Sequence, residues 1–181
     1  MNTQTILQQF EQEVERYIQA LEPYSIEQLT LQPDPQQWSL GQMYNHLIQS
    51  AQRMHLANID TCIKRQQAGE AITETTYKTH AGEHIIAMGS FPPIRVQVPA
   101  SPMYTPTQPH TKAELLEGLE QVRLRMRAIE PLLATTDPQY TVAHPRFGQL
   151  NATEWFAIIE MHYRHHWLQK DRLDQFLGMT V

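Results

Sequence analysis

Cysteine, glycine and long apolar runs are all scarce in this chain of 181 residues. The single cysteine, Cys62, excludes an internal disulfide and any zinc site rich in cysteine. No apolar run approaches the roughly 20 residues that a membrane-spanning helix needs. Residues 1–17 lack both the basic start and the apolar centre of a signal peptide. We therefore expect a cytoplasmic protein with no membrane association.

Positive charge is scarce as well, because 14 Lys and Arg residues face 19 Asp and Glu residues, a net charge of −5. A basic surface is what a phosphate backbone attracts, so nucleic acid is not an expected partner. The chain also contains no GxGxxG, GxxxxGK[ST], GxSxG or HExxH motif, and no Glu precedes a His by three positions. These absences argue against dinucleotide, P-loop, α/β-hydrolase and ferritin-like di-iron sites. A small-molecule substrate is the partner that we expect.

Proline is concentrated in one segment, since six of the twelve prolines fall between Pro92 and Pro109. Each proline removes a backbone donor and clashes with the preceding helical turn, so this segment cannot be the interior of a helix. It predicts a long extended crossover over about residues 69–110. The alternation at Ile94–Val98 is compatible with a short strand inside it. Elsewhere no pair of strand-like runs joined by a hairpin turn is evident.

Outside the crossover, apolar residues recur every three or four positions, as they do in helices that bury one face in a bundle. The four stripes are Leu7, Phe10, Val14, Tyr17 and Leu21; Leu40, Tyr44, Leu47, Ala51, Met54 and Cys62; Leu115, Leu119, Val122, Met126, Ile129 and Leu133; and Trp155, Ile158, Ile159, Leu173, Phe176 and Leu177. Together they predict a single all-α domain over residues 1–181, a four-helix bundle with the crossover between its second and third helices.

Capping-box signals stand where these helices are expected to begin. They are Ser39-x-x-Gln42, Thr111-x-x-Glu114 and Asn151-x-x-Glu154. A fourth, Ser25-x-x-Gln28, predicts a short extra turn before the break at Pro33–Pro35.

Two histidines interrupt the apolar stripe of the last helix. With His162 at 0° on a helical wheel, His166 lies at about 40° and Gln169 at about −20°, both inside the stripe. Burying two imidazoles is unfavourable unless their nitrogens find partners, and a divalent metal is one such partner. Hydrogen bonds within the core are the alternative explanation. The other HxxxH pair, His80 and His84, lies outside any stripe and is assigned no metal.

The third ligand that such a site needs stays open on spacing alone. On the wheel of the second helix His46 lies on one flank of the stripe, at about −100°, and His55 at about 80°. Both are candidates.

Two longer stretches carry a family resemblance. The residues Trp38–Leu47, WSLGQMYNHL, and the residues His144–Trp155, HPRFGQLNATEW, followed by HYRHHWLQ at His162–Gln169, resemble the DinB/YfiT-like superfamily. The resemblance implies a four-helix bundle that binds one divalent metal ion, zinc or nickel, through His46, His162 and His166. It also implies outer or substrate-contacting positions for His165 and Gln169, to which we add Tyr44. Gln42 departs from the acidic residue that relatives often have there.

The resemblance implies function as well. Its members include thiol S-transferases and metal-dependent hydrolases, so we expect a metal that activates a low-molecular-weight thiol or water for attack on a small electrophile. No catalytic residue of the chain itself is assigned. The alternative is a non-catalytic, metal-stabilised bundle that acts as a binding or stress-response accessory protein. Leu116 and Leu124 lie off the seam of the third helix, and relatives are often dimers, so we expect a homodimer.

Overall fold

The structure, a computed structural model, describes residues 1–72, 77–94 and 105–179. Within these residues it is mostly helical, and the predicted all-α bundle is confirmed. Its elements are α1 (Thr3–Leu21), α2 (Ile26–Thr30), α3 (Leu40–Ser50), the π-helix η1 (Ala51–Leu56), α4 (Ala57–Gln67), α5 (His80–Met88), α6 (Lys112–Leu133), β1 (Thr141–His144), β2 (Gly148–Asn151) and α7 (Ala152–Phe176).

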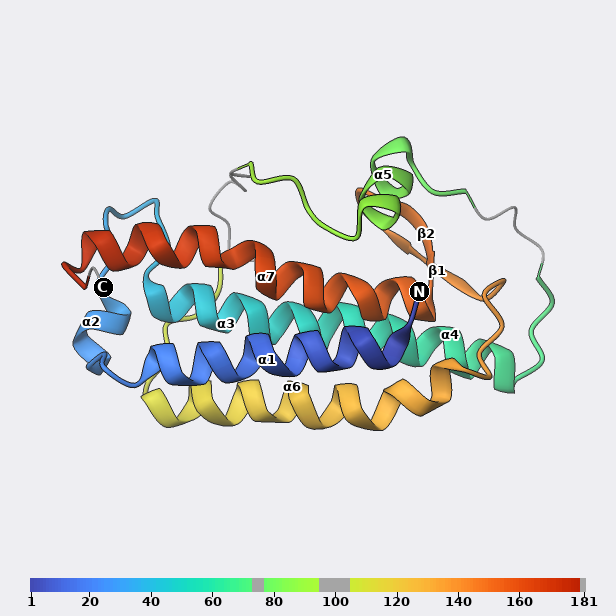
Figure 1. Cartoon of the computed structure of the whole chain (residues 1–181), viewed down its shortest axis with the longest axis horizontal. Coiled ribbons are helices and arrows are strands. Elements are labelled where there is room, and N and C mark those ends of the chain that lie inside the picture. Colours follow the sequence, from blue (N-terminus) through green and yellow to red (C-terminus); the bar gives the residue numbers. More distant parts are fainter. Residues whose placement is uncertain (73–76, 95–104, 180–181) are drawn as a thin grey trace.

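Four long rods run side by side: α1, the continuous α3–η1–α4 rod, α6 and α7 (Figure 1). α1 packs against α6 and α7, and α3 packs against the same two helices from the other side. The apolar stripes meet in one core, with Phe10, Leu47, Leu119 and Trp155 fully buried. Phe176 is an exception to its predicted stripe, because at the last residue of α7 it is 43% exposed. None of the helices within the described residues is both long and apolar enough to cross a membrane.

The helix starts follow the predicted caps. Complete capping boxes form at Ser25, Ser39 and Asn151, so the short extra turn is present as α2. The box predicted at Thr111 is half wrong. Thr111 does cap α6, but the Glu114 carboxylate accepts a hydrogen bond from the backbone N–H of the preceding residue instead of returning it to Thr111.

The second rod is not a uniform α-helix. After Ser50 the backbone widens into the π-helix η1 and returns to α-helix at Ala57. A π-helix fits more residues into each turn, so side chains beyond Ser50 no longer follow the 100° spacing of an α-helical wheel.

The expectation that no hairpin occurs is wrong. β1 and β2 pair antiparallel, with Thr141 opposite Asn151 and His144 opposite Gly148. Gly148 has a φ of +74°, and a Cβ there would lie 2.7 Å from the Tyr77 carbonyl oxygen, so the turn requires glycine. The hairpin leads directly into α7.

The crossover also contains a helix, α5, which sequence periodicity did not indicate. α5 lies beside the hairpin at one end of the bundle (Figure 1), with the Thr79 N–H donating to the Phe147 carbonyl at 2.9 Å. Gly82 permits this approach, because a Cβ there would lie 2.2 Å from the same oxygen. The Pro-rich part has no helix in its described residues, and the strand suggested at Ile94–Val98 falls mainly on residues 95–98, outside them.

The returning end of the crossover is fixed along α3 by side-chain amides. Gln42 Nε2 donates to the Pro106 carbonyl at 2.9 Å, and Asn45 Nδ2 donates to the Thr107 carbonyl at 2.8 Å. Gln49 reaches the Thr107 hydroxyl one turn further on. The crossover therefore ends beside the face of α3 that carries His46.

Candidate metal centre

Three of the predicted histidines converge in one place. His46 comes from α3, and His162 and His166 come from successive turns of α7. The Nε2 atom of His162 lies 3.0 Å from that of His46 and 3.0 Å from that of His166. One nitrogen from each ring lies within 4.8 Å of the others, close enough to share one metal ion, and all three side chains are partly buried.

Outer hydrogen bonds fix two of these rings. The Ser50 hydroxyl lies 2.6 Å from the His46 carbonyl and 3.3 Å from His162 Nδ1. Because a carbonyl can only accept, the hydroxyl donates to it and accepts from Nδ1–H of His162. His166 Nδ1 lies 3.0 Å from Gln169 Oε1, which can likewise only accept. Both rings therefore carry their proton on Nδ1.

This protonation leaves two Nε2 lone pairs, of His162 and His166, facing each other at 3.0 Å. Two acceptors at this distance repel each other unless a cation lies between them. The donor set of three imidazole nitrogens fits a divalent metal ion of the first transition row. Its outer partners, Ser50 and Gln169, are of the kind that orient metal-binding histidines.

Burial keeps the triad neutral, which is the form that binds metal. It lowers the pKa of His46 to about 4. It lowers the pKa of His162 and His166 well below the usual range, and the neighbouring imidazoles lower both further. Around neutral pH the three rings therefore offer lone pairs rather than positive charges.

His55, the other candidate for third ligand, lies close by but outside the triad. Its side chain is 2% exposed, and its ring centroid is 5.5 Å from that of His162 and 5.9 Å from that of Trp155. Burial lowers its pKa to about 3. Among the described residues no partner reaches His55 Nδ1. The structure thus groups His46, rather than His55, with the two histidines of α7.

The remaining predicted residues lie in different surroundings. Tyr44 is fully buried, and its hydroxyl donates to the Tyr17 carbonyl at 3.0 Å, a position that favours packing between α3 and α1. His165 is partly buried, with its ring 5.7 Å from that of His166. Cys62 is buried in the core. His80 and His84 are exposed on α5, apart from the triad.

The departure at Gln42 has a structural reason. Its Oε1 accepts from the Ser39 N–H, while its Nε2 donates to the Pro106 carbonyl. An acidic residue supplies only the first of these bonds when ionised, so the amide joins the cap of α3 to the crossover.

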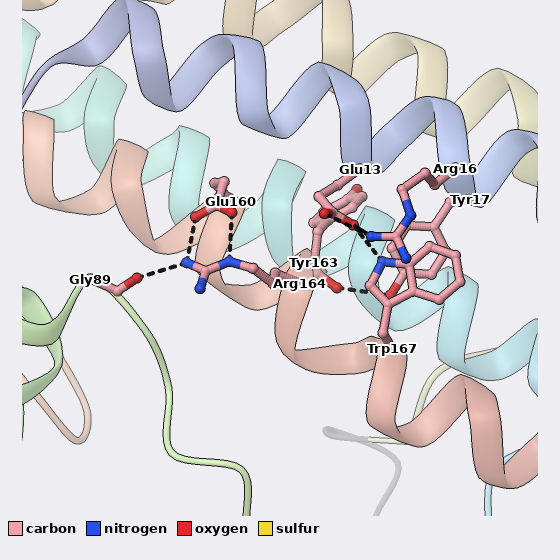
Figure 2. A network of polar contacts seen from close by, with 8 residues as sticks. All are labelled: Glu13, Arg16, Tyr17, Gly89, Glu160, Tyr163, Arg164 and Trp167. Atoms are coloured by element: carbon pink, nitrogen blue, oxygen red, sulfur yellow. Dashed lines mark hydrogen bonds and ion pairs between the residues drawn. The ribbon is translucent and has the colours of Figure 1, made fainter.

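A clamp on the opposite face of α7 aims the two histidines at α3 (Figure 2). The Trp167 ring is stacked on Tyr17, with centroids 4.4 Å apart, and the Arg16 guanidinium lies 4.3 Å above it. Trp167 Nε1 also donates to the Glu13 carboxylate. Because these partners all belong to α1, they fix the rotation of α7 about its axis.

Figure 2 also shows how the strap that follows α5 is attached. Arg164 donates to the Glu160 carboxylate and, at 2.7 Å, to the Gly89 carbonyl. This bond holds Phe91 with its ring 5.8 Å from that of His165 and 6.3 Å from that of His162. The strap and α7 enclose a cavity of about 130 Å³, lined by Ser90, Phe91, Pro93, Arg164, His165 and Leu168, with Met161 at its floor.

Aromatic rings thus stand on two sides of the triad. Phe91 flanks His162, and the Trp38 ring lies 4.8 Å from that of His46. Such walls limit the access of water and raise the strength of electrostatic interactions at the centre.

The fold and the site define a class of protein: a helical bundle whose three histidines can hold a metal ion. The family model of the DinB superfamily matches residues 9–169, and the chain belongs to that superfamily. No curated protein and no solved structure matched the chain in the corresponding comparisons.

Proposed function

We propose that His46, His162 and His166 bind one divalent ion, zinc or nickel, and that the chain is a metal-dependent enzyme. Its reaction is the activation of a low-molecular-weight thiol or of water for attack on a small electrophile, as in thiol S-transferases and hydrolases. The observation that supports this most strongly is the meeting of three neutral Nε2 atoms, two of them turned inward by Ser50 and Gln169.

The composition of the triad favours an anionic co-ligand. A bound divalent ion supplies Lewis acidity, which lowers the pKa of a thiol or water molecule. Three neutral imidazoles add no negative charge of their own, so they leave that acidity undiminished. The chain's only thiol, Cys62, is enclosed in the core, and burial raises its pKa to about 11. An external nucleophile is therefore required.

The number of protein ligands favours catalysis over a purely structural site. Structural zinc sites are closed by four protein ligands, whereas catalytic sites keep a position open. Within residues 1–72, 77–94 and 105–179, no carboxylate, thiol or fourth imidazole joins the triad. The cavity beside His165 offers space for the non-reacting part of a substrate.

Metal analysis and thiol titration test this proposal together. We expect one equivalent of metal per chain in the wild type and in His84→Ala, and much less in His166→Ala. His84 is a suitable control because it is an exposed histidine of the other HxxxH pair. With cobalt in place of the native metal, a small thiol should shift the visible absorption spectrum.

Three results would count against the proposal. Equal metal content in the wild type and His166→Ala would remove the metal site. A cobalt spectrum that no thiol changes, together with no turnover of model esters or epoxides, would favour the non-catalytic bundle instead. Loss of the fold on metal removal, without any thiol response, would point the same way.

A further inference from the structure

Ser50 joins two of the three triad residues, although they lie on different helices. It is the last residue of α3, four positions after His46, so its side chain lies on the same face of that helix. Its hydroxyl donates to the His46 carbonyl at 2.6 Å and accepts from His162 Nδ1–H at 3.3 Å. One hydroxyl thereby connects the backbone at one ligand to the ring of another.

We propose that Ser50 is a positioning residue, whose hydroxyl holds His162 in the Nδ1–H tautomer and so presents the Nε2 lone pair to the metal. This inference rests on the proposed function for the metal, but its statement about the tautomer holds for the metal-free chain as well. Nothing in the resemblance or the family match assigns a role to this serine.

His162 is the ring for which the tautomer matters most. Its Nε2 lies 3.0 Å from the Nε2 atoms of both other histidines, so a proton there would occupy the centre of the triad. Placing the proton on Nδ1 requires an acceptor at a buried position, because an unpaired buried donor is unfavourable. Ser50 is the acceptor that the structure provides, since the only hydrogen of its hydroxyl is already directed at the His46 carbonyl.

The tautomer is measurable directly. Two-bond ¹⁵N–¹H correlation spectra of ¹⁵N-histidine-labelled, metal-free protein distinguish Nδ1–H from Nε2–H imidazoles. We expect His162 to be predominantly Nδ1–H in the wild type and in Ser50→Thr, which keeps the hydroxyl. In Ser50→Ala we expect the Nε2–H form to become populated. Zinc affinity measured by competition with a chelator should fall about tenfold in Ser50→Ala, as is typical for loss of an outer partner, and recover in Ser50→Thr.

Thr61→Ala is the matched control. Thr61 makes the same kind of bond to the carbonyl four residues earlier, at 2.8 Å, but on an exposed part of α4. It should change neither the tautomer nor the zinc affinity, which separates the effect of Ser50 from general weakening of a helix. Circular dichroism of each variant establishes that the fold is retained.

Two outcomes would overturn the inference. One is a wild-type His162 that is mainly Nε2–H. The other is a Ser50→Ala chain that keeps both the Nδ1–H form and the wild-type zinc affinity. If the wild type binds no zinc, the proposed function fails, and the spectra of the metal-free chains still decide whether Ser50 sets the tautomer.

Discussion

Replacing His55 with phenylalanine tests how completely the histidines of this bundle are kept neutral. His55 is 2% exposed, and burial lowers its pKa to about 3. Phenylalanine keeps an aromatic ring against Trp155 and His162 but carries no titrating nitrogen. The substitution therefore removes one proton-binding group from the core with little change of shape.

The sign of the expected effect follows from the two pKa values. An unfolded histidine titrates near 6.5 and the folded His55 near 3, so between these pH values the unfolded chain binds one more proton than the folded chain. The free energy of unfolding must then fall as the pH falls. Each such proton is worth about 1.4 kcal/mol per pH unit. Integrated from pH 7.5 to pH 5.5 around a pKa of about 6.5, His55 alone loses about 1.4 kcal/mol of stability.

Urea denaturation in the presence of a chelator measures this difference. We expect the free energy of unfolding of His55→Phe, relative to the wild type, to rise by about 1.4 kcal/mol between pH 7.5 and pH 5.5. At pH 7.5 the variant should be at least as stable as the wild type, because among the described residues His55 Nδ1 has no hydrogen-bond partner to lose.

The exposed His84 supplies the control, since His84→Ala should follow the wild-type pH dependence. Parallel curves for His55→Phe and the wild type would refute the reasoning. They would mean that folding does not exclude the proton from His55.

Other substitutions probe packing and association. Gly82→Ala should lower the free energy of unfolding by about 1–3 kcal/mol in thermal melts, because its Cβ would meet the Phe147 carbonyl at 2.2 Å; a neutral result would mean that α5 is not docked on the hairpin. Tyr163→Phe should be neutral or stabilising by about 1 kcal/mol, since its buried hydroxyl has no partner among the described residues. Tyr44→Phe should instead cost about 1 kcal/mol, because it loses a bond to a backbone carbonyl of α1; equal effects of the two would contradict this distinction. Leu124, 52% exposed on α6, lies on the face expected to form a homodimer, so sedimentation should show a dimer for the wild type and a monomer for Leu124→Glu, whereas a monomeric wild type would end that proposal.

Much of the bundle is predictable because its signals are local. The stripe from Leu115 to Leu133 and the box at Ser39 each act within a few residues, and both fold as expected. The hairpin was missed because each strand has four residues, too few for a period to be recognised. The positive φ of Gly148 depends on the approach of Tyr77, a contact distant in sequence.

The candidate site was predictable in part. His162 and His166 could be found from their place inside an apolar stripe, whereas spacing could not choose between His46 and His55. The π-helix is the reason, since a wheel of constant 100° steps loses its meaning after Ser50. The family resemblance selected His46, and the geometry groups it with the pair on α7. Ser50 was missed because a serine four residues after a histidine is too common a spacing to stand out.

The π-helix also constrains how this chain can change in length. Deleting one residue from Ala51–Leu56 would let the segment close into ordinary α-helix, turning everything after it by about 100° and drawing it in by about 1.5 Å. Ile59 and Cys62, both buried, would be carried away from α7 toward solvent. An insertion or deletion in this rod is therefore harder to accommodate than a substitution, and the spacing between His46 and Cys62 is a property of the fold in its own right.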